Sequence, residues 1–104
     1  MRPIEKFDVV VIGSGAAGAS AAIALANHAN VAIVSKAELT EGSTRYAQGG
    51  IAAVLNASDS IESHCQDTLL AGAGLCHEDA VRYTVEHSRE AIQWLIAQGV
   101  PFTQ

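Results

Sequence analysis

The chain has 104 residues with a formal net charge of −5, and 49% of them are hydrophobic although only 5% are aromatic. This acidic balance excludes a basic nucleic-acid-binding surface. No apolar stretch has the length of a membrane span, and the N-terminus does not resemble a signal peptide, so we expect a cytoplasmic protein without membrane or nucleic-acid partners. Its core must be built from Ala, Val, Ile and Leu, and its length alone would allow one small domain.

The first element is a predicted strand, Phe7–Ile12, whose β-branched run is typical of a parallel strand covered on both faces. Glycines follow it at G-x-G-x-x-G spacing, and a predicted helix over about Ala16–Asn27 begins at once. Gly13 permits the tight turn, Gly15 lets a pyrophosphate approach the backbone, and Gly18 allows close packing of the helix on the strand. The segment therefore predicts a dinucleotide-binding turn, with an ordinary structural turn as the alternative.

The second predicted strand, Val31–Val34, completes the β-α-β pattern, but it departs from the usual one at its end. A carboxylate is expected there to bind a ribose hydroxyl, and the chain has Ser35-Lys36 instead. Ser35 can still form a weaker hydrogen bond to a ribose, and Lys36 either meets a phosphate or is solvated. The absence of this carboxylate makes NAD a less favoured ligand for the turn.

Residues 43–51 form a second glycine-rich segment, predicted as a loop that runs into a short helix. The adjacent Gly49 and Gly50 allow the backbone to approach a ligand closely. Ser43, Thr44 and Gln48 supply uncharged donors and acceptors, which suit the polar edge of a flavin ring. The alternative is a solvated connecting loop, because these residue types are common in loops.

Two further helices are predicted, over Ser60–Ala73 and over Asp79–Gln98. Ser60 is a candidate N-cap of the first. In the second, apolar residues recur at helical spacing, Gly99 is a stop signal, and Pro101 follows it.

The two cysteines, Cys65 and Cys76, each have a histidine neighbour, His64 and His77. Adjacent side chains point to different faces of a helix or strand, so they converge poorly on one ion. We expect two free thiols and no metal, with a zinc site as the alternative; a disulfide does not suit a cytosolic chain.

Two strands and three helices do not complete a doubly wound fold, because a two-stranded parallel sheet cannot cover itself. We therefore expect an α/β fold in which residues 1–104 are the N-terminal portion of a Rossmann-like FAD-binding domain, truncated after Gln104, with capping and C-terminal domains absent.

The order of these motifs resembles the succinate dehydrogenase/fumarate reductase flavoprotein superfamily, and within it the aspartate-oxidising branch. The resemblance covers essentially the whole chain. It is carried by G-S-G-A-A-G, V-S-K, T-E-G-S-T, Y-A-Q-G-G-I-A-A-V, D-T-L-L-A-G-A-G-L-C and G-V-P-F, in that order.

The resemblance implies FAD as the cofactor, and it assigns FAD-binding roles to two groups of residues. The first group is the phosphate turn and the end of the second strand: Gly13, Ser14, Gly15, Ala16, Ala17, Gly18, Ser35 and Lys36. The second group lines the flavin: Ser43, Thr44, Arg45, Tyr46, Ala47, Gln48, Gly49 and Gly50. Arg45 has an alternative interpretation as an exposed loop charge. Ser43 occupies the position at which the respiratory members have a histidine bonded to FAD, which implies non-covalent FAD here.

The implied activity is oxidation of L-aspartate to iminoaspartate, with oxygen or fumarate as electron acceptor. The product feeds quinolinate synthesis and so NAD, which makes quinolinate synthase a candidate partner. The family's catalytic residues are expected beyond Gln104, so no catalytic residue is assigned in this chain, and it is expected to be inactive alone. The rival interpretations are a fumarate reductase or succinate dehydrogenase flavoprotein, and a non-catalytic fragment.

Overall fold

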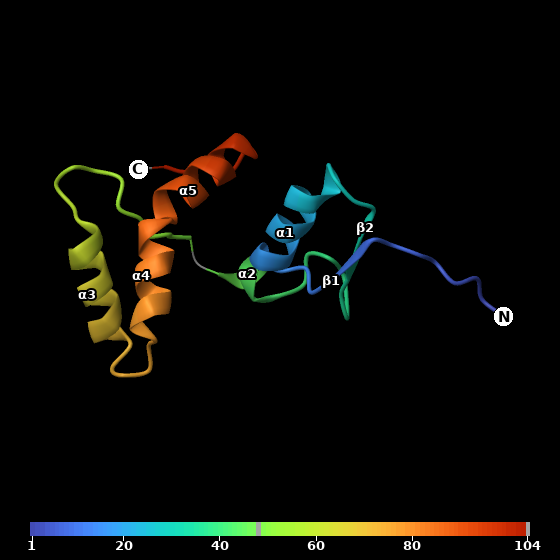
Figure 1. The fold of residues 1–104 in the computed structure, drawn as a ribbon, viewed down its shortest axis with the longest axis horizontal. Helices are drawn as coiled ribbons and strands as arrows, with labels where there is room; N and C mark the ends of the chain where they lie inside the picture. Colours follow the sequence, from blue (N-terminus) through green and yellow to red (C-terminus); the bar gives the residue numbers. More distant parts are fainter. Residues whose placement is uncertain (48, 104) are drawn as a thin grey trace. The chain divides into compact units, whose positions relative to one another are not determined.

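The computed structural model describes residues 1–47 and 49–103, which form two compact units, residues 1–49 and 50–104 (Figure 1). The first unit contains strand β1 (Val9–Ile12), helix α1 (Ala16–Ala26), strand β2 (Val31–Val34) and the short helix α2 (Ser43–Tyr46). The second unit contains helices α3 (Ile61–Ala71), α4 (Glu78–Glu86) and α5 (Ser88–Ala97). The α/β class with a parallel sheet is confirmed.

Strands β1 and β2 pair in parallel, with Val9 opposite Val31 and Ile12 opposite Val34. The observed strand β1 is shorter than the predicted strand Phe7–Ile12, because residues 7 and 8 precede the residues that pair with β2. There the Asp8 carboxylate accepts a hydrogen bond from the Asn30 amide at 2.8 Å. This side-chain contact holds the entry of β1 beside the entry of β2.

Helix α1 covers one face of this sheet and leaves the other open. Side chains alternate along a strand, so Val11 faces the helix while Val10 and Ile12 point the opposite way. Ile12 is 87% exposed, and its partner Val34 is exposed as well. A parallel sheet is ordinarily covered on both faces. In the first unit, therefore, one face of the sheet is packed against α1 and the other is exposed and apolar.

Helix α3 begins at a side-chain cap, as its sequence predicts. The Ser60 hydroxyl oxygen accepts a hydrogen bond from the Ser63 amide at 3.0 Å, which satisfies one of the free donors of the first turn. Arg82 on α4 forms an ion pair with Glu62 on α3 at 3.0 Å. In the described part of this unit the buried apolar side chains are Cys65, Val85 and Ile92.

The single helix expected over Asp79–Gln98 is wrong, because the structure divides it into α4 and α5 at His87. The His87 backbone leaves the helical region, with φ −94° and ψ 2°. Its ring nitrogen Nδ1 lies 2.7 Å from the Tyr83 carbonyl, and the Ser88 hydroxyl donates to the Val85 carbonyl at 2.7 Å. Side chains that hydrogen-bond to backbone carbonyls compete with the helical ladder, which accounts for the break.

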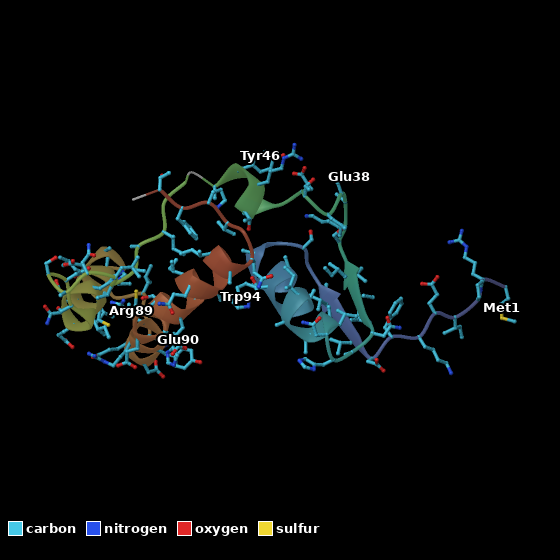
Figure 2. The ribbon with its side chains drawn as sticks, turned by 90° about the horizontal axis from the view of Figure 1, so that it is seen from above. Met1, Glu38, Tyr46, Arg89, Glu90 and Trp94 are labelled. Carbon is cyan, nitrogen blue, oxygen red and sulfur yellow. The ribbon has the colours of Figure 1, made fainter. Side chains whose placement is uncertain are left out.

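After the break, α5 ends as predicted and is anchored near its start. Gly99 follows it with φ +94°, the left-handed conformation that ends a helix. Near the other end, the Arg89 guanidinium (labelled in Figure 2) donates to the Leu55 carbonyl at 2.9 Å. Arg89 therefore has a structural role, in holding the segment that precedes α3.

Candidate functional site

The glycine turn between β1 and α1 has the geometry that its spacing predicts. Gly13 has φ +109°, and its amide donates to the Val34 carbonyl at 2.8 Å, so the turn continues from the paired strands. A methyl group on Gly18 would overlap the Gly13 carbonyl oxygen and would lie 3.4 Å from Val11 Cγ1. Gly18 is therefore required by the close approach of α1 to β1.

Gly15 differs from Gly18, because the chain itself does not require a glycine there. Its backbone is extended, with φ −69° and ψ −177°, a conformation that any residue adopts. A methyl group on Gly15 would have Thr44 Oγ1 at 3.5 Å as its nearest neighbour, an ordinary contact. The missing side chain therefore leaves open space directly at the N-terminus of α1. This is the observation expected of a glycine that admits a ligand to the backbone.

The N-terminus of α1 offers hydrogen-bond donors to that space. The first N–H groups of a helix have no partner within the helix, and they carry the positive end of its dipole. Gly15 is the N-cap and has no side chain to satisfy them. An anionic group is favoured at such a position.

A pocket of about 700 Å³ opens beside the turn, and it unites three sequence segments. These are the phosphate turn, the end of β2 and the start of the second glycine-rich segment. Its lining comprises Ile12, Gly13, Ser14, Gly15, Val34, Ser35, Lys36, Ala37, Glu41, Gly42, Ser43, Thr44 and Tyr46. Residues that are far apart in sequence thus meet at the carboxyl ends of parallel strands, where ligands bind in open α/β sheets.

A second pocket, of about 540 Å³, adjoins the first on the side of Arg45. The two pockets share Ser14, Gly15, Glu41, Gly42 and Thr44, and the second adds Leu39, Thr40 and Arg45. We refer to both together as the glycine-turn groove. Its charged side chains in the described residues are Lys36, Glu41 and Arg45.

The structure brings some of the predicted flavin-lining residues into this groove and leaves others outside its lining. Ser43, Thr44, Arg45 and Tyr46 line it, whereas Ala47, Gly49 and Gly50 do not. Gln48 lies outside the described residues. The order of loop and helix also differs from expectation, because α2 occupies the start of the segment and irregular backbone follows it.

Of the phosphate-turn candidates, Ala16, Ala17 and Gly18 do not line the groove. The Ala16 amide donates to Thr44 Oγ1 at 3.2 Å. At the end of β2, the Ser35 hydroxyl donates to the Ala37 carbonyl at 2.6 Å. Ser35 thus retains only acceptor capacity toward a ribose.

Glu41 and Gly42 are among the groove residues that the reasoning from sequence missed. Gly42 has φ +155° and is the N-cap of α2, so a side chain there would be strained. Glu41 lines both pockets, and its carboxylate accepts from the Tyr46 hydroxyl at 3.1 Å. Both residues lie in the T-E-G-S-T motif, so their place next to Ser43 is the signal that could have identified them.

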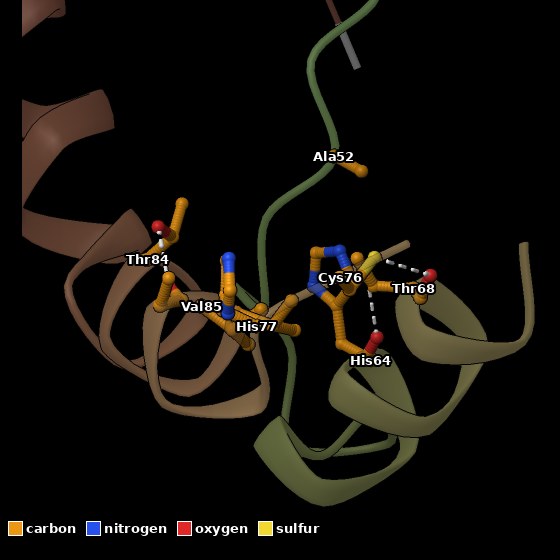
Figure 3. A pocket seen from close by; sticks show the side chains of 9 residues that line it. Ala52, His64, Thr68, Cys76, His77, Thr84 and Val85 are labelled. Carbon is orange, nitrogen blue, oxygen red and sulfur yellow. Dashed lines mark hydrogen bonds between the residues drawn. The ribbon is translucent and has the colours of Figure 1, made fainter. Parts of the chain in front are cut away.

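A separate pocket of about 390 Å³ lies within the second unit, between α3 and α4 (Figure 3). His64, Cys76 and His77 line it, so the fold places these candidate ligands around one cavity. Among residues 1–47 and 49–103, however, no group of three such side chains is placed to hold a metal ion. Cys65 is buried on α3, and both cysteines are free thiols. The pocket itself is mostly apolar, with Val81 and Val85 in its wall.

No helix in the described part of the chain is both long and apolar enough to cross a lipid bilayer.

A parallel β-α-β unit with a glycine turn, an open helix N-terminus and a groove at the strand ends defines a dinucleotide-binding domain. Residues 8–104 match the FAD binding domain family, and the chain belongs to that family. FAD is accordingly its cofactor. The residues of the groove fit this group, because Gly15 leaves room at the α1 N-terminus where a pyrophosphate is favoured.

Curated relatives place the chain more narrowly. It is 68% identical over 99 residues to the L-aspartate oxidase of Pseudomonas aeruginosa and 61% identical over 98 residues to that of Vibrio cholerae. It is 52% identical over 98 residues to the chloroplastic L-aspartate oxidase of Oryza sativa. These alignments cover 95%, 94% and 94% of this chain but 18%, 18% and 15% of the relatives. The chain thus spans less than a fifth of the length of these relatives.

A solved structure shows the same fold. A mutant of the FrdA chain of E. coli quinol fumarate reductase matches with a TM-score of 0.84 and 38% sequence identity. The match covers 94% of this chain and 17% of that chain. The expected resemblance to the succinate dehydrogenase/fumarate reductase flavoproteins is confirmed.

Proposed function

We propose that the full-length protein is a flavin-dependent oxidoreductase that oxidises L-aspartate to iminoaspartate, and that this chain supplies part of its FAD site. The observation that carries the proposal is the 68% identity to an L-aspartate oxidase over 95% of the chain. Residues 1–104 would then be the N-terminal portion of the FAD-binding domain. Oxygen or fumarate would accept the electrons, and the product would enter quinolinate and NAD synthesis in the cytoplasm, with quinolinate synthase as a candidate partner.

Within this proposal, the chain's own residues bind and orient the cofactor and do not react with the substrate. Gly13, Ser14 and Gly15 would admit the pyrophosphate to the N-terminus of α1, and Lys36 would contribute a positive charge nearby. Ser43 to Gly50 would lie along the flavin. When bound, FAD supplies the two-electron acceptor for the oxidation of the substrate.

The assay of the full-length protein with L-aspartate and with succinate tests this proposal. We expect iminoaspartate from L-aspartate, with reduction of oxygen or fumarate, and little oxidation of succinate. A protein that oxidises succinate and not L-aspartate would contradict it. That second candidate, a succinate dehydrogenase or fumarate reductase flavoprotein, is favoured by the fold of the E. coli fumarate reductase chain. Ser43, in place of a histidine, argues against the members of that group that bind FAD covalently.

A further inference from the structure

The hydrogen bond between Ala16 and Thr44 joins the two glycine-rich segments across 28 positions of sequence. Helix α1 has no side-chain cap of its own, because its N-cap is Gly15. The Thr44 hydroxyl takes the place of that cap by accepting from the Ala16 amide at 3.2 Å. A glycine that admits the ligand thus leaves a donor unsatisfied, and a residue from α2 satisfies it.

We propose that Thr44 is a positioning residue of the FAD site, which holds α2 against the phosphate turn before the cofactor binds. This inference rests on the proposed FAD-binding role of the groove. Thr44 lines both pockets of the groove, and its Oγ1 lies 3.5 Å from the place of a Cβ on Gly15. The hydroxyl is therefore at the edge of the space that Gly15 leaves for the ligand.

One hydroxyl can serve both α1 and the cofactor. A threonine hydroxyl carries one donor and two acceptor positions, and the Ala16 amide uses one acceptor. Its proton is then free to be donated to an anionic oxygen that enters the groove. Hydrogen bonds to charged groups are about twice as strong as neutral ones. Serine keeps both capacities, whereas valine has the shape of threonine and neither of them.

The expected consequence is pre-organisation. When the Ala16 amide is bonded to Thr44, the phosphate turn and α2 are already in place before FAD binds, so less ordering is required on binding. Without the hydrogen bond from Ala16 to Thr44, the exposed Ala16 amide has only water as its acceptor, the first turn of α1 frays, and α2 must be ordered by the cofactor. Both the affinity for FAD and the protection of the phosphate turn against hydrogen exchange, measured without FAD, should fall.

The test compares Thr44→Val, Thr44→Ser and wild type in the full-length protein after removal of FAD. We expect Thr44→Val to raise the Kd for added FAD at least about tenfold, and Thr44→Ser to stay within about threefold of wild type. Flavin fluorescence titration gives the Kd. Hydrogen–deuterium exchange of the segment 13–20, measured without FAD, should be faster in Thr44→Val only. Thr84→Val is the control, because the Thr84 hydroxyl donates to the Ala80 carbonyl within α4.

The outcomes are distinguishable. If Thr44→Val binds FAD as wild type does, or if Thr44→Ser loses as much affinity as Thr44→Val, the positioning role is wrong. If hydrogen exchange in the segment 13–20 is equal in all variants, the hydrogen bond between Ala16 and Thr44 does not hold the turn, and the inference also fails. If wild type itself does not bind FAD, the proposed function fails and the role of Thr44 with it.

Discussion

A methyl group on Gly18 would overlap the Gly13 carbonyl oxygen, so contact with the first glycine of the turn requires a glycine at its last position. Gly15, between them, has no such neighbour. The same spacing thus contains glycines of two kinds: Gly18 is required by the packing of α1 on β1, whereas no contact within the chain requires Gly15, to which we assign a ligand-binding role. The two kinds predict different effects of substitution.

Gly18→Ala should destabilise the full-length protein. The added methyl group forces α1 away from β1, and overpacking of this kind costs about 1–3 kcal/mol. A lower thermal midpoint of the cofactor-free protein checks this, with Gly15→Ala as the matched control. Equal midpoints for the two variants would show that the turn relaxes at little cost.

Gly15→Val should abolish FAD binding while the fold survives. The branched side chain enters the open space at the N-terminus of α1, and the loss comes from a clash with the pyrophosphate. The measurement is the flavin absorbance of the purified full-length variant, together with its circular dichroism. A yellow, folded variant would refute the phosphate assignment of Gly15.

FAD should leave the full-length protein on denaturation. The residue at the position of the covalent histidine is Ser43, which lines the groove but has no nucleophilic ring nitrogen. After acid precipitation the yellow colour should remain in the supernatant. Colour that stays with the pellet and migrates with the protein on a denaturing gel would contradict this prediction and favour the respiratory dehydrogenases.

The ion pair between Glu62 and Arg82 should stabilise the packing of α3 on α4 only at pH values at which the Glu62 carboxylate is ionised. The hydrogen bond from Arg82, followed by the charge of its guanidinium, holds the pKa of Glu62 below its ordinary value of 4.5. Because the folded pKa is lowered, the contribution to the free energy of unfolding is present above pH 4.5 and is lost as the pH falls through the folded pKa.

The measurement is the urea midpoint of wild type and Glu62→Gln in the full-length protein. The variant should be slightly less stable at neutral pH, since exposed pairs contribute little, and the difference should vanish in acid. Glu90→Gln is the control, because Glu90 is exposed on α5 without a paired cation among the described residues. A difference that persists in acid would mean that packing, and not charge, is responsible.

The isolated 104-residue chain should be marginally folded and prone to association. Ile12 on the open face of the sheet is 87% exposed, and Leu75 in the second unit is 90% exposed. Exposed apolar patches and unpaired strand edges favour association. We expect poor dispersion in its NMR spectrum and no cooperative melting transition. A well-dispersed spectrum with a sharp transition would overturn this prediction.

Local patterns in the sequence were sufficient for the elements whose signals lie within one short segment. The G-x-G-x-x-G spacing predicted the turn at Gly13, and Val31–Val34 was predicted as a strand with the bounds that the structure has. Ser60 and Gly99 marked the start of α3 and the end of α5. In each case the backbone conformation follows from neighbouring residues, through β-propensity, a cap or a positive φ.

Only the tertiary structure decided how distant residues combine. The break at His87 depends on side chains that bond to carbonyls one turn away, and helical spacing of apolar residues does not reveal that competition. The hydrogen bond from Ala16 to Thr44, and the different reasons for Gly15 and Gly18, arise because β1, α1 and α2 meet at one groove. The sequence by itself indicated the kind of ligand, whereas the packing of these elements decided which residues line the groove.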